Sequence, residues 1–376
     1  MMNMNAPGLY IHIPFCLRKC PYCDFYSVTT LTRLTAFLEA LGAEMALYCG
    51  EFAPFDTVYI GGGTPSLLAP QQLATILDRV RENFPLLPDT EITLETNPAD
   101  LDHASLTAIR GMGVNRLTIG CQSFDQALLT FLGRRHSATQ AGDAIATARC
   151  AGFTNIGVDL IYGIPGQGIA QWLDALRRCL AYQPEHLSCY QLTVEEGTPL
   201  GNSYRHKAFS LPNEDLALEF FMQTAELLKG AGYVHYEVSN FARGMAFASR
   251  HNQKYWDHTP YLGLGPGAHS FATNRRWWNY RSVDRYLAAL GAGERPVAAT
   301  ESLTNEQLQL EALYLGMRTK QGIHLQDYAL RYHVDLLAQK KDRLSALQKE
   351  GLITIEDGRL HPTRAGLAVA DSLALL

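Results

Sequence analysis

The sequence predicts an α/β protein, with a barrel of six βα units followed by a small helical, winged-helix-like domain. Three observations indicate this fold class. Short β-rich apolar runs alternate with amphipathic helical stretches from residue 8 to about residue 235. Glycine, proline or polar residues follow directly after the strands. Beyond residue 300 the pattern changes to three helices and a hairpin.

Six short runs have the length and composition of buried strands. They cover residues 9–13, 57–61, 91–96, 116–121, 156–163 and 187–193. The helical patterns between and after them cover residues 34–48, 70–84, 138–152, 169–182 and 213–232. Successive βα units require a parallel sheet with right-handed crossovers, as either a barrel or a doubly wound sheet.

The residues that follow the strands favour the barrel. After strands two to six they are GGGTPS (61–66), TNPAD (96–100), CQSFD (121–125), YGIPGQ (162–167) and TVEEGTP (193–199). The first strand runs into a loop rich in cysteine. A barrel collects such loops on its top face, whereas a doubly wound sheet concentrates them at one switch point.

Three regions are expected along the chain. Residues 1–235 form the barrel, 236–300 form an irregular extension that contains HNQKYW, and 301–376 form the small C-terminal domain. The stretch 291–303 has the composition of a linker. The last region combines helices at 305–318, 325–333 and 337–351 with a hairpin whose turn is Asp357-Gly358. Packing or protein contact is its simplest role.

Composition narrows the function classes. A net charge of -5 without blocks of Lys or Arg argues against nucleic acid as a partner. No apolar window reaches the length of a membrane span, and the N-terminus lacks the features of a secretory signal. Eight cysteines in 376 residues are too sparse for a disulfide scaffold. We therefore expect a cytoplasmic protein whose clustered cysteines bind metal or take part in catalysis.

Three of those cysteines lie within eight positions. Cys16, Cys20 and Cys23 have the spacing C-x3-C-x2-C, and Phe25 stands where a further C-x-C cysteine would be. Structural zinc sites and ferredoxin-type clusters both require four protein ligands. Three thiolates can instead hold three irons of a [4Fe–4S] cluster and leave the fourth iron open. A zinc site completed by a distant ligand is the alternative.

The segment CLRKCPYC resembles the cysteine motif of radical S-adenosylmethionine (SAM) proteins, in which the open iron binds the amine and carboxylate of SAM. Tyr22, just before the third cysteine, fits that pattern. The GGGTP segment resembles the one that these proteins lay against the methionine amino group. The resemblance implies a partial (β/α)6 radical SAM barrel with a [4Fe–4S] cluster and SAM.

Further motifs are similar to one branch of that superfamily, which contains oxygen-independent coproporphyrinogen III dehydrogenase (HemN) and the HemW heme chaperones. These are YIHIPFCLRKCPYCDFYS, YIGGGTPSLL, LETNP, IGCQSF, GVDLIYGIPGQ and LTVEEGTPL. The likeness covers nearly the whole chain and is greater to the HemW group. It implies that the SAM contacts are Tyr10, Tyr22, Gly62, Gly63, Thr64, Glu95, Gln122, Arg134 and Asp159.

Two departures from the dehydrogenase disfavour its reaction. The dehydrogenase motif continues to a fourth cysteine, at the position of Phe25, and a long N-terminal arm precedes its cluster. Here 15 residues precede Cys16. Whether the chain is an enzyme stays open, and coproporphyrinogen dehydrogenation is the alternative function.

The string HNQKYW (251–256) resembles the H-N-x-x-Y-W motif of the HemW group. His251 could supply an axial imidazole to heme, and Tyr255 and Trp256 could cover a flat macrocycle. Residue chemistry alone leaves His251 open between a ligand and a hydrogen-bonded structural histidine. His258 and His269 are weaker candidates for a second ligand.

The resemblance therefore implies a heme chaperone that binds heme and passes it to recipient hemoproteins. Its expected partners are heme, a heme donor and heme-receiving proteins, some of them in membranes, where the chain would act peripherally. A homodimer is also an expectation. Radical modification of RNA is a third possible function, for which the winged-helix-like module would bind the RNA. The negative net charge of the chain argues against it.

Overall fold

A computed structural model describes residues 6–373. Six parallel strands form its centre, in sequence order across the sheet: β1 (Gly8–Ile13), β2 (Phe55–Gly62), β3 (Leu86–Thr96), β4 (Arg116–Gln122), β5 (Ile156–Tyr162) and β6 (His186–Gln191). β1 pairs with β2 and with β9 (Tyr261–Leu264), not with β6, so the barrel is open. The predicted barrel of six βα units is confirmed as this open form.

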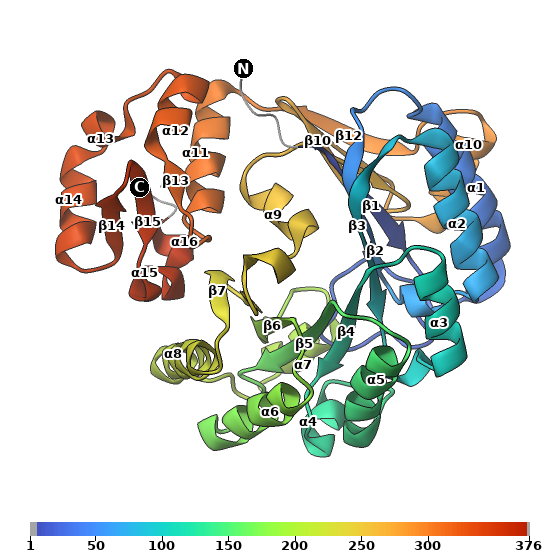
Figure 1. Cartoon of the computed structure of the whole chain (residues 1–376), viewed down its shortest axis with the longest axis horizontal. Helices are drawn as coiled ribbons and strands as arrows, with labels where there is room; N and C mark the ends of the chain where they lie inside the picture. Colours follow the sequence, from blue (N-terminus) through green and yellow to red (C-terminus); the bar gives the residue numbers. More distant parts are fainter. Residues whose placement is uncertain (1–5, 374–376) are drawn as a thin grey trace.

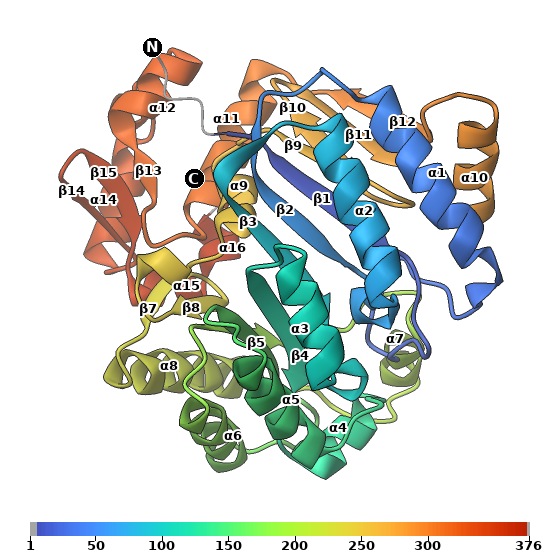
Figure 2. The same cartoon turned by 45° about the vertical axis from the view of Figure 1, so that its right-hand side comes forward.

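Helices connect the strands, and most of them cover the outer face of the sheet (Figures 1 and 2). They are α1 (Leu34–Leu47), α2 (Pro70–Asn83), α3 (His103–Gly111), α4 (Gln126–Phe131), α5 (Ala138–Cys150), α6 (Ile169–Ala181), α7 (Pro199–Arg205) and α8 (Glu214–Gly230). The predicted N-cap of α8 is confirmed, because the Asn213 side chain accepts a hydrogen bond from Leu216 N. Sequence reasoning missed α3, α4 and α7, which are short.

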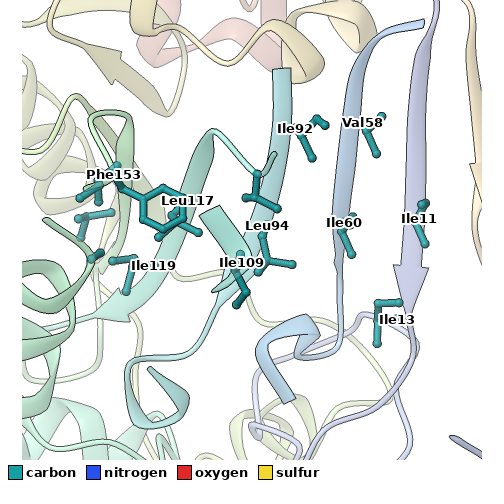
Figure 3. Close-up of a cluster of buried hydrophobic side chains, with 14 of the residues drawn as sticks. Ile11, Ile13, Val58, Ile60, Ile92, Leu94, Ile109, Leu117, Ile119 and Phe153 are labelled. Atoms are coloured by element: carbon teal, nitrogen blue, oxygen red, sulfur yellow. The ribbon is translucent and has the colours of Figure 1, made fainter. Parts of the chain in front are cut away.

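Side chains alternate along the central strands, and this alternation separates the core from the barrel interior. Apolar residues on one face form a core cluster with residues of the helices. Figure 3 shows Ile11, Val58, Leu94 and Ile119 of this cluster on the strands, with Ile109 of α3 nearby. The residues between them point to the opposite face, and many are polar: Tyr10, His12, Thr57, Tyr59, Thr93, Glu95, Arg116 and Thr118. A barrel filled only by packing would carry branched apolar side chains there. The polar interior therefore indicates a ligand cavity.

The region 236–300 is more regular than expected. It contains β8 (Asn240–Ala242), α9 (Arg250–Trp256), β9, β10 (His269–Ala272), β11 (Arg275–Asn279), α10 (Val283–Gly291) and β12 (Val297–Ser302). These strands and β7 (Val234–Glu237) extend the sheet to the order β12-β11-β10-β9-β1-β2-β3-β4-β5-β6-β8-β7. The expectation of an irregular extension and a linker was wrong, because strands of three to six residues are too short to show a periodic pattern. The expected boundaries at 235 and 300 fall inside β7 and β12.

The C-terminal domain contains α11 (Asn305–Gly316), β13 (Ile323–His324), α12 (Leu325–Tyr332), α13 (Leu336–Gln339), α14 (Lys341–Lys349), β14 (Ile353–Glu356), β15 (Arg359–Pro362), α15 (Arg364–Ala368) and α16 (Ala370–Leu373). The predicted hairpin is confirmed, and Asp357 and Gly358 both have positive φ, as a type I′ turn requires. The third predicted helix is divided at Lys340 into α13 and α14. Figure 1 shows α9 between this domain and the first strands.

Candidate cofactor site at the mouth of the barrel

The cysteine loop follows β1 and is fixed at its base by backbone hydrogen bonds. Cys16 N donates to Val28 O at 3.0 Å, and Val28 N donates to Pro14 O at 2.7 Å. A tight turn then brings Cys23 N to within 3.1 Å of Cys20 O. Cys16 is buried, whereas Cys20 and Cys23 are partly exposed. The loop thus holds three free thiols at the carboxyl end of the first strand.

Each thiol lies beside a hydrogen-bond donor. Thr64 Oγ1 donates to Cys16 Sγ at 3.3 Å, and an Arg134 guanidinium nitrogen lies 3.5 Å from Cys20 Sγ. Burial raises the pKa of the Cys23 thiol, and the backbone of Phe25 opposes this with a hydrogen bond. Donors of this kind stabilise thiolates, the form that binds metal.

Burial, and after it the charges of Cys20 and Cys16, raise the pKa of the Cys23 thiol, so the three thiols lie near one another. Within residues 6–373 no group of three or more His, Cys, Asp or Glu side chains could hold a single metal ion. A zinc ion draws its ligands into one tetrahedral shell. A [4Fe–4S] cluster is larger and distributes its thiolates over different irons. Three neighbouring thiols are the ligands that a cluster with one open iron requires, whereas a structural zinc ion would require a fourth ligand.

The GGGTP segment lies against the base of the cysteine loop. Gly63 N donates to Ile13 O, and Thr64 N donates to Phe15 O, both at 2.8 Å. A Cβ at Gly63 would lie 2.6 Å from Phe15 O, which is backbone and cannot yield easily. Gly62 has a φ of +110°, a conformation that glycine adopts without strain. These glycines allow the approach of strand end and cysteine loop that the fold requires.

A cavity of about 1050 Å³ opens beside the loop and continues along the barrel interior. Eight of the nine residues predicted to contact SAM line it, together with Cys23. They are Tyr22, Gly62, Gly63, Thr64, Glu95, Gln122, Arg134 and Asp159. They come from five different strands or strand ends, and the barrel brings them onto one surface.

Tyr10 is the predicted SAM contact that does not line the cavity. Its hydroxyl lies 2.9 Å from His12 Nδ1, and its ring packs near Tyr59 and His251. Tyr22 lines the cavity from the other side and packs against an apolar cluster that includes Leu132 and Ile164.

Three polar atoms of the predicted SAM residues in the cavity wall are buried without a hydrogen-bond partner among the described residues. They are Gln122 Oε1, Arg134 Nε and Asp159 Oδ1. Gln122 also has a φ of +65°, which is uncommon for a residue other than glycine. Buried polar groups normally find partners, so these atoms fit a site that a polar ligand completes.

Glu95 lies at the centre of the wall. Its carboxylate accepts hydrogen bonds from Tyr59 Oη at 2.8 Å and from Gly62 N at 2.9 Å. Burial raises the pKa of Glu95 to about 7, against these two hydrogen bonds. Burial also raises the pKa of Asp159 to about 6. A cationic ligand in the cavity would favour the ionised form of both carboxyl groups.

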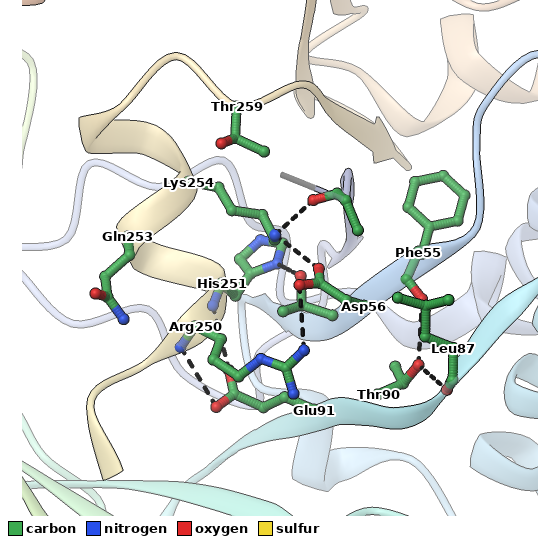
Figure 4. Close-up of polar contacts among 12 residues, drawn as sticks. Phe55, Asp56, Leu87, Thr90, Glu91, Arg250, His251, Gln253, Lys254 and Thr259 are labelled. Atoms are coloured by element: carbon green, nitrogen blue, oxygen red, sulfur yellow. Dashed lines mark hydrogen bonds and ion pairs between the residues drawn. The ribbon is translucent and has the colours of Figure 1, made fainter. Parts of the chain in front are cut away.

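The HNQKYW motif forms α9, which crosses the N-terminal ends of the first strands (Figure 4). Its first backbone amides, those of Arg250 and His251, donate to the Glu91 carboxylate at 3.4 and 3.2 Å. Lys254 Nζ lies 2.6 Å from an Asp56 carboxylate oxygen. These contacts anchor the helix inside the fold.

His251 is 1% exposed, and both of its ring nitrogens have hydrogen-bond partners. Nδ1 lies 2.8 Å from Thr57 Oγ1, and Nε2 lies 2.9 Å from Tyr255 Oη. Its ring stacks on Tyr59 at 5.1 Å, and burial lowers its pKa to about 3. In this conformation the imidazole is a neutral structural group, and ligation of heme iron requires one hydrogen bond to break.

The remaining heme candidates make other contacts. The indole nitrogen of Trp256 is buried without a partner among the described residues. His258 lies 3.3 Å from Glu311 and from Tyr332 of the C-terminal domain, and His269 stacks on Trp278.

Sequence reasoning missed cavity residues from the first halves of the strands and from the C-terminal domain. Arg116, His186 and Ser188 line the cavity at strand starts, and Arg318 lines it from beyond the barrel. The signal for the first three was the alternation of polar and apolar residues in β4 and β6. Arg318 carried no local signal.

Known protein families match two parts of the chain. Residues 10–179 match the radical SAM superfamily, and residues 303–369 match the HemN C-terminal domain. Over its length the chain is 37% identical to a protein of Mycobacterium tuberculosis named heme chaperone HemW. That similarity covers 97% of this chain and 93% of that protein. The chain belongs to the HemW family.

Other relatives agree with this membership. The chain is 35% identical to radical S-adenosyl methionine domain-containing protein 1, mitochondrial, of Bos taurus, covering 98% of this chain and 88% of that protein. Coproporphyrinogen III oxidase (HemN) from Escherichia coli shares the fold, with a TM-score of 0.83 at 24% identity over 98% of this chain and 89% of that one. The resemblance read from the motifs is confirmed, and the superfamily implies a [4Fe–4S] cluster and SAM as cofactors.

Among residues 6–373 the helices are all too short or too polar to cross a membrane.

Proposed function

We propose that this chain is a heme chaperone, which binds heme and delivers it to recipient hemoproteins while it carries a [4Fe–4S] cluster and SAM. The observation that carries the proposal is full-length membership of the HemW family on a chain whose three free thiols lie beside a cavity with unpaired polar atoms. Cytoplasmic location, peripheral contact with membrane hemoproteins during delivery and homodimer formation belong to the same proposal.

The cofactor part assigns residues to roles. Cys16, Cys20 and Cys23 would hold the cluster, and the Gly62–Thr64 edge would lie along the methionine part of SAM. A bound cluster with an open iron supplies a coordination position for the amine and carboxylate of SAM. Arg134, between Cys20 and the cavity, would orient a carboxylate, since a guanidinium matches its geometry. Asp159 and Gln122 would complete their hydrogen bonds on the ligand.

Phe25 supports the chaperone over the dehydrogenase. It stands where the dehydrogenase motif has its fourth cysteine, and its side chain is 67% exposed at the cavity mouth. His251, Tyr255 and Trp256 stay candidates for heme contact within this proposal.

One sample tests both functions. After anaerobic reconstitution of the cluster, we expect stoichiometric heme binding, transfer of heme to an apo-hemoprotein, and no turnover of coproporphyrinogen III. Heme transfer is followed by the absorption spectrum of the recipient. Turnover of coproporphyrinogen III with release of 5′-deoxyadenosine would indicate the dehydrogenase function instead of the chaperone function. Absence of heme binding would contradict the chaperone function.

SAM binding should weaken in acid because of Glu95. Its pKa of about 7 means that the carboxylate becomes protonated below neutrality and loses its attraction for the sulfonium cation. We expect the Kd for SAM to be constant above pH 8 and to rise roughly tenfold per unit below pH 7. Glu95→Gln should bind SAM weakly with a flatter pH profile, as measured by calorimetry on reconstituted protein.

Glu44→Gln is the matched control. Burial raises the pKa of Glu44 to about 7 as well, but that carboxylate bonds Asn279 and Tyr286 and does not line the cavity. Its replacement should leave the pH profile of SAM binding unchanged. If the Kd for SAM kept its pH dependence in Glu95→Gln, the titration would belong to another group.

A further inference from the structure

The barrel cavity extends beyond the predicted cofactor residues to the opposite end of the strands. Arg116 and His186 are the first residues of β4 and β6, and both line it. Gln122, by contrast, is the last residue of β4. Asn252 of α9 and Arg318 of the C-terminal domain line the same end. We call this end, lined by these four residues, the lower half of the cavity. No predicted cluster or SAM residue belongs to it, so these side chains have no role in the cofactor site described above.

Arg116 is a buried cation without an anionic partner. It is 1% exposed, and its guanidinium donates to Asn155 Oδ1 and Phe247 O, both at 2.9 Å and both neutral oxygens. Its Nε has no partner, and the guanidinium makes no ion pair with any carboxylate of residues 6–373. Burying a charge without a counter-ion is costly. The Asp159 carboxylate interacts with this guanidinium only at a distance, so Arg116 Nε stays open to an anion that enters the cavity.

His186 adds a second unpaired atom at the same end. It is 2% exposed, and its Nε2 lies 2.7 Å from Tyr236 Oη. The Tyr236 hydroxyl also accepts from Ser249 N, and the imidazole tautomer decides which group donates in the bond to Nε2. Nδ1 is buried without a partner among the described residues. Arg116 Nε and His186 Nδ1 are thus both buried without a partner among the described residues.

Arg318 brings a further cation from the C-terminal domain. It pairs with Asp371 and donates to Tyr314 Oη at 3.0 Å, and it lies 5.9 Å from the Trp256 ring. The buried, unpartnered indole nitrogen belongs to that same tryptophan. The side chain of Asp371 is largely exposed, so its ion pair with Arg318 contributes little free energy. The guanidinium can turn toward a stronger anion.

A guanidinium is always a donor, an imidazole nitrogen is one when it carries the proton, and a carboxylate is the anion that they match best. We propose that the lower half of the barrel cavity is a subsite for a carboxylate arm of a tetrapyrrole, with Arg116 as its ionic anchor and Arg318 as a second contact. Heme carries such arms as propionates. The proposal rests on the proposed heme function and names the side chains that would orient the cargo in the barrel.

The first test needs no variant. Heme and heme dimethyl ester differ only in the charge of their two arms, and binding of each to the reconstituted wild-type chain is measured by absorption titration. We expect heme to bind at least roughly tenfold more tightly than the ester, the effect of one charge-assisted contact. Equal affinities would overturn the subsite while leaving the heme function intact.

The second test locates the contact. Arg116→Gln should bind heme and the ester equally, and Arg318→Gln should reduce the preference for heme partly. Arg149→Gln is the control, because Arg149 bonds the Glu185 carboxylate at 3.0 Å and does not line the cavity. It should keep the wild-type preference. A preference that survives in folded Arg116→Gln, judged by circular dichroism, would overturn the assignment.

A third ligand separates this proposal from the proposed function. Coproporphyrin, a metal-free tetrapyrrole with four carboxylate arms, is followed by its fluorescence. If heme fails to bind the wild-type chain but coproporphyrin binds in an Arg116-dependent manner, the subsite stands and the chaperone function falls. If neither ligand binds, the subsite falls too.

Discussion

Replacing Cys20 by Ser should remove the iron–sulfur cluster from the anaerobically reconstituted protein. A serine hydroxyl is a poor substitute for a thiolate as an iron ligand, and the loop has no spare thiol. We expect iron affinity to fall by more than about tenfold, since even outer-shell changes cost 10–100-fold. Iron and sulfide content and the visible absorption band measure the loss. Cys16→Ser and Cys23→Ser should behave alike.

The chain supplies its own controls for this experiment. Cys49 and Cys150 are exposed, and their replacement by Ser should leave iron content unchanged. Cys121, Cys179 and Cys189 are buried, and burial raises the pKa of each thiol well above its ordinary value. If any of these five replacements removed the cluster, a fourth protein ligand would exist and no iron would be open for SAM. Addition of SAM should change the cluster spectrum of the wild type.

Replacing His251 by Ala should destabilise the chain even without heme. The change leaves the Thr57 hydroxyl buried without its imidazole partner and removes the partner of Tyr255 as well. Each orphaned group costs about 1–3 kcal/mol, and a cavity forms against the Tyr59 ring. We expect the free energy of unfolding to fall by about 3 kcal/mol or more, as measured by urea denaturation of the apo chain.

His206→Ala is the control for that measurement, because His206 is exposed and its replacement should change stability by less than about 0.5 kcal/mol. An unchanged midpoint for His251→Ala would contradict the packing described here. Loss of heme by this variant has two physical causes, lost ligation or lost structure. Added imidazole separates them, since it can restore an axial ligand and its heme spectrum but cannot restore the helix contacts.

The sequence predicted the main sheet well for a physical reason. Strands such as 9–13 and 156–163 are buried on one or both faces, and their β-branched residues lie between long helical patterns. The flanking strands β7–β12 were missed because they are short, so that their order depends on pairing with neighbours. Cys16, Cys20 and Cys23 were visible because their spacing is local.

By itself, the sequence determined the barrel, the cysteine loop and the family resemblance, since each depends on residues close together in the chain. Only the tertiary structure decided which polar residues share the cavity. It brought Arg116, His186 and Arg318 to one end of the barrel from three distant segments, and it gave His251 partners on both nitrogens. Such contacts depend on packing between helices and strands, and local sequence patterns do not predict which of these elements come into contact.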